Sequence, residues 1–337
     1  MIAGMGQLDV HRRGAELRRG LSDEEIRRRY TGTDWHRLRW GAYVERLQYE
    51  ELDDVDRHRT LIDAIEPTMA DDAVVSHQSA AVIYGAPLWQ APLDRVMVTR
   101  NRRYGGRIKS DVKVHCAPMD AVVEMDGLLV TTPARTVVDL ARTLPFESAV
   151  VTGDALVRDF GLSGNDLAAE LEVAKSRRGI AAAHRVVSFL DGHSESVGES
   201  RSRAMFARLE LPAPVSQGNV FTSAHKVLGR VDFYLEGTGV LCEFDGRIKY
   251  GRLLRSGQEP GDAVFAEKLR EDAMRACGFQ LVRWTWQDLT TEHPATRIRA
   301  ALARQRSTPY DGYITQAPLP PPRPYVTKIC TLTRDRH

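Results

Sequence analysis

The chain has 337 residues, of which 42% are hydrophobic and 27% charged, so it is long enough for two or three domains of ordinary globular composition. The formal net charge of +2 excludes a polycation, and any nucleic-acid-binding surface must therefore be a local patch. Four scattered cysteines without a C-x-x-C pair argue against a disulfide framework and a cysteine zinc site, and for a reducing compartment. No apolar run approaches the roughly 18 residues of a membrane span. We therefore expect a cytoplasmic protein with no membrane partner.

The first 45 residues predict two short helices, a turn and a small hairpin. Ser22 followed by Glu25 forms a capping box at the start of the second helix. Between Val10 and Gly41 there are nine arginines against five acidic residues. This excess is typical either of a solvated helix face or of contacts with phosphate groups.

Residues 46–190 predict a mixed α/β middle domain. "DRVMVTR" and "SDVKVHCAP" read as strands, and "TTPARTVVDLARTL" reads as a helix that begins at Pro133. Residues 146–190 read as helices joined by a turn near Gly161. The loop between the two strands contains six basic residues and no acidic one from Arg95 to Ser110. It is either the soluble tip of a hairpin or a DNA contact, and we favour contact with phosphates by Arg100, Arg102, Arg103 and Arg107.

Four segments of this half, "LSDEEIRRRY", "WHRLRWGAYV", "SHQSAAVIYGAPLW" and "DGLLVTTPARTVVDLA", resemble the AbiEi-type antitoxin family. The resemblance implies a winged helix–turn–helix at residues 1–45, an α+β domain at 46–190, duplex DNA as ligand and a cognate toxin as partner. It implies that Thr33 to Arg39 contains the recognition element and that the hairpin after Trp40 is the wing. The DNA-binding residues would be Arg27, Arg28, Trp35, His36, Arg37 and Arg39.

Two acidic strands stand out in the last third of the chain. "RVDFYL" and "VLCEFD" alternate with a period of two, and the "EGTG" between them is a turn sequence. The register that pairs Leu235 with Val240 places Asp232 opposite Glu243, with Asp245 on the same face. Like charges at opposed positions destabilise a hairpin, so a positive charge should lie between them.

The order helix, hairpin, helix, strand over residues 194–290 resembles the PD-(D/E)XK nuclease superfamily, in the branch similar to very-short-patch repair endonucleases. The matching elements are Glu199, "VDF" at Asp232, "EFDG" at Glu243, "EKLRED" and "LVRW". The resemblance implies a restriction-endonuclease-like α/β domain at residues 191–306. It implies that Mg²⁺ or Mn²⁺ is bound by Asp232, Glu243 and the backbone carbonyl of Phe244, with Glu199 as a further ligand.

The sequence departs from the nuclease pattern at one position. The family carries a lysine two residues after the glutamate, where this chain has Asp245. Lys249 occupies the place where close relatives have a histidine, and it would orient the attacking water or steady the scissile phosphate. Two alternatives remain: a nuclease fold that binds without cleaving, and a surface hairpin neutralised by Arg230 and Arg247.

The chain is thus predicted to be an α+β multidomain protein. Its leading predicted function is a Mg²⁺-dependent DNA endonuclease in restriction or phage defence, guided by the winged helix. The alternative is a transcriptional repressor or antitoxin with a non-cleaving nuclease fold. A homodimer is expected, because cutting both strands symmetrically usually needs two sites. Residues 307–337, with "APLPPPRPYV", predict a proline-rich tail that does not pack.

Overall fold

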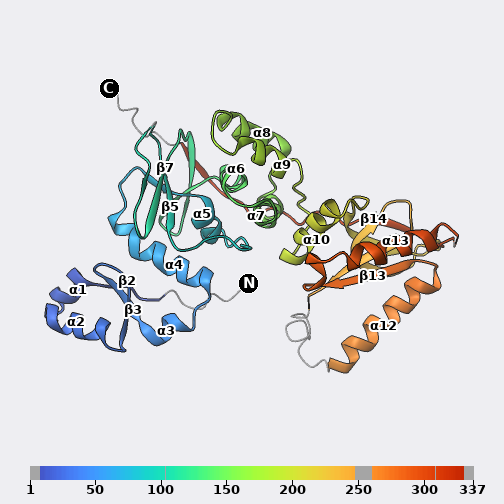
Figure 1. Cartoon of the computed structure of the whole chain (residues 1–337), viewed down its shortest axis with the longest axis horizontal. Helices are drawn as coiled ribbons and strands as arrows, with labels where there is room; N and C mark the ends of the chain where they lie inside the picture. The colour runs from blue at the N-terminus through green and yellow to red at the C-terminus, as the bar shows by residue number, and fades with distance from the viewer. Residues whose placement is uncertain (1–7, 103, 247–259, 308, 330–337) are drawn as a thin grey trace. The chain divides into compact units, whose positions relative to one another are not determined.

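The computed structural model describes residues 8–102, 104–246, 260–307 and 309–329. Helices and three sheets confirm the mixed α+β class (Figure 1). The chain divides into two compact units, which are described separately below. Unit 1 comprises Met1–Leu144, Leu162–Val187 and Pro324–His337, and unit 2 comprises Pro145–Gly161 and Ser188–Arg323.

The amino-terminal part of unit 1 is a three-stranded sheet of order β1-β3-β2 with short helices beside it. Its small core is formed by Ile26, Trp35 and Tyr43. The predicted capping box is confirmed, because the Glu25 N–H donates to the Ser22 hydroxyl and the Ser22 N–H donates to the Glu25 carboxylate. The elements are β1 (His11–Arg12), α1 (Arg13–Arg18), α2 (Asp23–Thr31), β2 (Trp35–Arg39), β3 (Ala42–Glu45) and α3 (Arg46–Glu50).

The rest of unit 1 contains a seven-stranded sheet of order β15-β8-β9-β4-β5-β7-β6. The two predicted strands are β5 and β7, which pair in parallel, and the helix predicted from Pro133 is α6. The hairpin β8–β9 was not predicted. The elements are α4 (Asp54–Ile65), η1 (Glu66–Thr68), β4 (Ala73–Val75), α5 (His77–Ile83), β5 (Val96–Arg100), β6 (Arg107–Ile108), β7 (Val112–Cys116), β8 (Ala121–Met125), β9 (Leu128–Thr131) and α6 (Pro133–Thr143).

Three helices follow α6, as predicted for residues 146–190. They are α7 (Phe146–Phe160), α8 (Gly164–Val173) and α9 (Ile180–Val187). Gly161 ends α7 with a φ of 61°, a left-handed conformation that glycine adopts without strain, and the predicted turn is confirmed. α7 packs on α10 (Val197–Arg208) in unit 2, so the expected middle domain of residues 46–190 contributes to both units.

Unit 2 is built on a five-stranded sheet of order β13-β12-β11-β10-β14. β10, β11 and β12 form an antiparallel meander, and β13 returns parallel to β12 after helix α12. The elements after α10 are β10 (Val215–Phe221), β11 (Val227–Leu235), β12 (Val240–Asp245), α12 (Pro260–Ala276), β13 (Gln280–Thr285), η2 (Asp288–Thr290), α13 (His293–Gln305) and β14 (Tyr313–Gln316).

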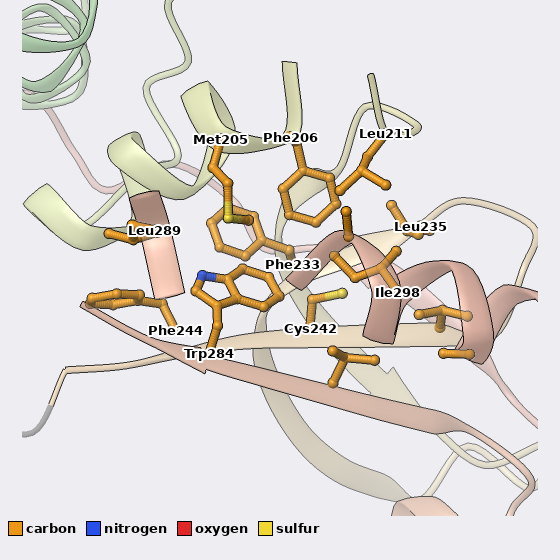
Figure 2. Close-up of a cluster of buried hydrophobic side chains, with 14 residues drawn as sticks. Met205, Phe206, Leu211, Phe233, Leu235, Cys242, Phe244, Trp284, Leu289 and Ile298 are labelled. Carbon is orange, nitrogen blue, oxygen red and sulfur yellow. The ribbon is translucent and has the colours of Figure 1, made fainter. Parts of the chain in front are cut away.

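One face of this sheet carries the apolar core of unit 2, shown in Figure 2. Phe233 of β11 and Trp284 of β13 are fully buried there, and Phe206 of α10 meets the Trp284 ring edge-on at 5.5 Å between centroids. The Trp284 indole N–H donates to the Ser202 hydroxyl at 2.8 Å, so its one polar atom is satisfied. The opposite face carries a second buried cluster, in which Tyr234 of β11 and Leu241 of β12 pack with Met274 and Phe279.

The proline-rich tail was expected not to pack, and that expectation is wrong for two of its segments. Tyr313–Gln316 forms β14, which pairs with β10 in unit 2. Thr327–Ile329 forms β15, which pairs with β8 in unit 1. Strand pairing uses backbone groups, so it does not require the alternating apolar pattern that the tail lacks.

Candidate functional site

The carboxylates of the acidic hairpin lie in the register that the sequence predicts. β11 and β12 pair Phe233 with Cys242 and Leu235 with Val240. One residue further on, the Phe244 N–H donates to the Asp232 carboxylate at 2.8 Å, so Asp232 lies against the β12 backbone beside Glu243. The two acidic groups are therefore close neighbours on adjacent strands.

Two arginines of the chain itself supply positive charge to Glu243. Arg270 of α12 donates to one oxygen of the Glu243 carboxylate at 2.6 Å, and Arg283 of β13 donates to the other at 2.8 Å. Both arginines also contact Glu267. Burial alone would lower the pKa of Arg270, but Glu267 and Glu243 raise it above its ordinary value. Glu243 is thus the centre of a network of arginines and carboxylates.

This network bears on the expected metal site. Each oxygen of Glu243 accepts a hydrogen bond from a guanidinium group, so a cation at Glu243 would share the carboxylate with Arg270 and Arg283. Within the described ranges, no group of three or more histidine, cysteine or acidic side chains is placed to hold a metal ion. Because Mg²⁺ in proteins is commonly held by one or two carboxylates and several waters, Asp232 and Glu243 stay the predicted ligands.

The remaining residues expected at this site are placed as follows. Asp245 is half-buried at the end of β12. The Phe244 N–H donates to the Asp232 carboxylate, and the Phe244 carbonyl stays a predicted metal ligand. Lys249 lies outside the described residues, as does Arg247. Arg230 contacts Glu195 instead of the acidic pair.

Glu199 has a structural explanation of its own. It lies in the first turn of α10 and is 3% exposed. Its carboxylate accepts hydrogen bonds from the Glu195 N–H at 2.8 Å, the Ser196 hydroxyl at 2.7 Å and the Gln217 amide at 2.7 Å. Burial raises the pKa of Glu199. The side chain therefore helps to cap α10, where a negative charge is favoured.

The amino-terminal DNA-binding prediction needs one clear correction. Trp35 is 1% exposed, and its indole N–H donates to Glu45 at 2.9 Å, so it belongs to the core and cannot lie nearest DNA. Thr33 to Arg39 is a turn followed by strand β2, which makes it part of the hairpin instead of a recognition helix. Of the residues predicted to contact DNA here, Arg27 and Arg28 on α2 and Arg37 on β2 are exposed.

His36 and Arg39 serve contacts within unit 1. The half-buried His36 ring stacks on Tyr49 at 4.4 Å between centroids, and burial lowers its pKa. Arg39 pairs with Asp111 at 3.0 Å and donates to the Thr68 hydroxyl at 2.6 Å. Neither side chain is as open to DNA as the sequence suggested.

Arg39 nevertheless meets the basic loop. It lines a hollow of about 470 Å³ together with Arg100, Arg102, Arg107 and Lys109, and the lining contains no acidic residue. Arg100 and Arg102 both donate to Asp72, at 2.7 Å and 3.0 Å, while Arg107 is exposed. Arg103 lies outside the described residues. Three of the four predicted loop arginines therefore gather with Arg39 around one hollow.

Sequence reasoning missed the two arginines that neutralise Glu243. Both stand in motifs that were noticed, Arg270 in "EKLRED" and Arg283 in "LVRW". They lie on α12 and β13, the two elements that follow β12, so their positive charges could have indicated a partner for Glu243.

The match to a protein-family model lies mainly in unit 1. Residues 73–192 match the family model of the AbiEi antitoxin C-terminal domain, which confirms that part of the predicted resemblance. Two Mycobacterium tuberculosis proteins, Uncharacterized protein MT2308 of strain CDC 1551 / Oshkosh and Uncharacterized protein Rv2248 of strain H37Rv, are 28% identical over 184 residues. The alignment covers 54% of this chain and 66% of each relative, just under two thirds of their length.

Among solved structures, the chain is similar to the crystal structure of RV2827C protein from Mycobacterium tuberculosis. That similarity has a TM-score of 0.36 and 16% identity, and it covers 57% of this chain and 74% of the other. In the part of the chain that the structure describes, every helix is too short or too polar to cross a membrane.

Proposed function

We propose that this chain is a DNA-binding transcriptional repressor of the antitoxin type. The observation that carries the proposal is the match of residues 73–192 to the AbiEi antitoxin C-terminal domain. A cognate toxin as protein partner is part of the same proposal and rests on the description of that family. Unit 2 would then contribute to binding and would not cleave DNA.

The amino-terminal elements support a DNA-binding role for this chain. Two short helices, α1 and α2, precede the hairpin β2–β3, and β1 closes the sheet on β3. This is the order of elements in a winged helix, in which the second helix enters the major groove and the hairpin is the wing. Arg27 and Arg28 are exposed on α2, and Trp40 is 79% exposed at the tip of the hairpin. These side chains are available for phosphate and groove contacts.

The proposal is tested by a mobility-shift titration on duplex DNA from upstream of the gene. We expect nanomolar to micromolar binding by the wild type, and at least tenfold weaker binding by the Arg27→Ala/Arg28→Ala variant. The slope of log affinity against log salt should fall by about two, because about one counterion is released per phosphate contact. The matched control is Arg304→Ala/Arg306→Ala, which removes two exposed charges from unit 2. Failure of the wild type to bind, or equal binding by both variants, would refute the proposal.

A second candidate is the metal-dependent DNA endonuclease. Two observations favour it: the meander β10–β12 followed by α12 and parallel β13, and the juxtaposition of Asp232 and Glu243. The test is plasmid cleavage with and without Mg²⁺ or Mn²⁺, by wild type, by Asp232→Ala and by the turn variant Glu236→Ala as control. Cleavage lost only in Asp232→Ala would support the enzyme. Binding without cleavage, unchanged in Asp232→Ala, would leave the repressor as the function.

A further inference from the structure

A second hollow in unit 1, of about 320 Å³, has no role in either function proposed above. It lies where one face of α6 meets α5, β7 and the segment after α8, elements that Figure 1 labels in the same part of the molecule. Its lining holds four arginines and two histidines: Arg135, Arg142, Arg177, Arg178, His77 and His115.

Three buried side-chain nitrogens at this hollow have no hydrogen-bond partner among the described residues. Arg135 is 4% exposed, and its Nη2 is unpartnered. His77 is 3% exposed, and its Nε2 is unpartnered, as is the Nε2 of His115. Buried polar groups are normally hydrogen-bonded, and an exception calls for an explanation such as an absent ligand.

The arginines at this hollow exceed the carboxylates that face them. Asp139 accepts from Arg135 at 2.8 Å and from Arg142 at 3.0 Å, and Glu170 lies 3.8 Å from Arg135. Arg177 and Arg178 form no ion pair within the described parts of the chain. Burial, then the charges of Arg135 and Arg142, lower the pKa of Arg177. The hollow therefore holds positive charge that the chain does not neutralise.

The histidines add two neutral rings to this surface, and His77 supplies a donor. The Thr99 hydroxyl donates to the Ser76 hydroxyl oxygen. The Ser76 hydroxyl in turn donates to Nδ1 of His77, at 2.9 Å. With Nδ1 as acceptor, the hydrogen of His77 is on Nε2, the unpartnered atom. The His77 and His115 rings stack at 4.0 Å, and burial lowers their pKa to about 4 and about 3. His77 also has a φ of 53°, an uncommon conformation for a residue with a side chain.

The backbone around Gly179 fixes two of the arginines in place. A Cβ at Gly179 would lie 2.2 Å from the Arg142 carbonyl oxygen, and its φ of 85° also favours glycine. The Arg142 guanidinium donates twice to the Arg178 carbonyl, at 3.1 Å and 3.0 Å. This close contact holds Arg177 and Arg178 at the edge of the hollow.

We propose that this hollow binds the phosphate group of a small molecule, either inorganic phosphate or a nucleotide. Arg135 Nη2, His77 Nε2 and the guanidinium groups of Arg177 and Arg178 offer more donors than the roughly four acceptor sites of a carboxylate can take. A phosphate group has three or four acceptor oxygens, and arginine matches them in charge and geometry. The volume lies at the lower end of small-molecule pockets, which suits a phosphate with a small attached group better than a duplex.

Isothermal titration calorimetry on the full chain tests this proposal, with inorganic phosphate, adenosine monophosphate and adenosine triphosphate as probes and no DNA present. We expect one equivalent to bind, and at least tenfold weaker binding in R177Q and R178Q. R304Q, which removes an exposed arginine of unit 2, should bind as the wild type does. Tighter binding of a nucleotide than of phosphate would identify a nucleotide site, and equal binding an inorganic phosphate site.

The proposal is overturned if no probe binds at millimolar concentration, or if R177Q and R178Q bind as tightly as the wild type. R135Q also removes a partner of buried Asp139 and is therefore a poorer probe, whereas Arg178 is exposed and its substitution spares the core. Because the titration contains no DNA, its result is independent of whether the chain is a repressor.

Discussion

The acidic network of unit 2 and the arginine-lined hollow of unit 1 are opposite in how their charge is balanced. At Glu243, two arginines from different elements occupy both carboxylate oxygens. Around Asp139, two arginines share one carboxylate and two more have no acidic partner among the described residues. Both regions look like sites on the basis of charged residues alone. The contrast is the basis of our proposal, because charge that the chain leaves unbalanced is available to a ligand and balanced charge is not.

The largest effect on stability is expected from Asp139→Asn, which removes the negative charge that balances Arg135 and Arg142 in unit 1. Asp139 is 1% exposed between Arg135 and Arg142, so the substitution leaves two buried guanidinium groups without their counter-charge. We expect the free energy of unfolding to fall by about 3–5 kcal/mol, measured by urea denaturation. Asp94→Asn, at an exposed position, is the control. If the two variants were equally stable, the pairing around Asp139 would be unimportant.

The next effect concerns pH. The pKa values of His77 and His115 are lowered to about 4 and about 3, so the unfolded chain, with ordinary histidines, binds more protons than the folded chain as pH falls below about 6.5. The two histidines therefore do not destabilise the folded state above about pH 6.5. Below that pH they lower the free energy of unfolding progressively towards pH 4, by up to about 1.4 kcal/mol per pH unit for each histidine.

Thermal midpoints measured from pH 8 to pH 4 check this dependence. His77→Gln should flatten it, whereas His293→Gln, at an exposed position in unit 2, should leave it unchanged. Equal pH profiles for wild type and His77→Gln would contradict the burial of that ring in solution.

A smaller loss is expected from Glu243→Gln in unit 2. The neutral amide can no longer balance Arg270 and Arg283, but Glu267 remains bonded to both, so we expect a loss of about 2 kcal/mol. Urea denaturation measures it, with Glu236→Gln in the exposed turn as control. A gain of stability on adding Mg²⁺ to the wild type would instead indicate that Glu243 releases its arginines to a cation.

The smallest effect should come from Arg275→Gln, which removes an exposed pair with Glu271. Exposed pairs four residues apart in a helix contribute about 0.3–0.5 kcal/mol. A shift of the urea midpoint barely above experimental error would show that the burial of an ion pair, and not the number of ion pairs, determines the contribution to stability. A loss as large as that of Glu243→Gln would remove this distinction.

Local patterns of the sequence were sufficient for several elements. The alternation on either side of "EGTG" fixed the register of Leu235 against Val240, and Ser22 with Glu25 fixed the start of α2. Asp126 and Gly127 also carried a turn signal, with φ values of 52° and 77°, yet the hairpin β8–β9 went unpredicted because its short strands merge with the helix pattern that follows.

Other features could not be read from local patterns. Arg270 and Arg283 reach Glu243 from 27 and 40 residues away, and periodicity says nothing about contacts at that distance. Trp35 was expected at DNA from the family resemblance, but it packs with Ile26 and Tyr43 in the small core of the amino-terminal sheet. The expected metal site depended on the same missing information, namely what lies next to a carboxylate in space.

The tail strands have a consequence for how the protein can be dissected. The chain passes between the two units at four places, after Leu144, Gly161, Val187 and Arg323. β14 completes one sheet and β15 the other, so removing the last thirty or so residues strips an edge strand from each half at once. A fragment that ends near residue 190 lacks β15 and therefore exposes the backbone edge of β8, with which β15 pairs. No single cut in this polypeptide yields an intact unit, so a fragment meant to isolate either unit needs its separate segments joined by new connections.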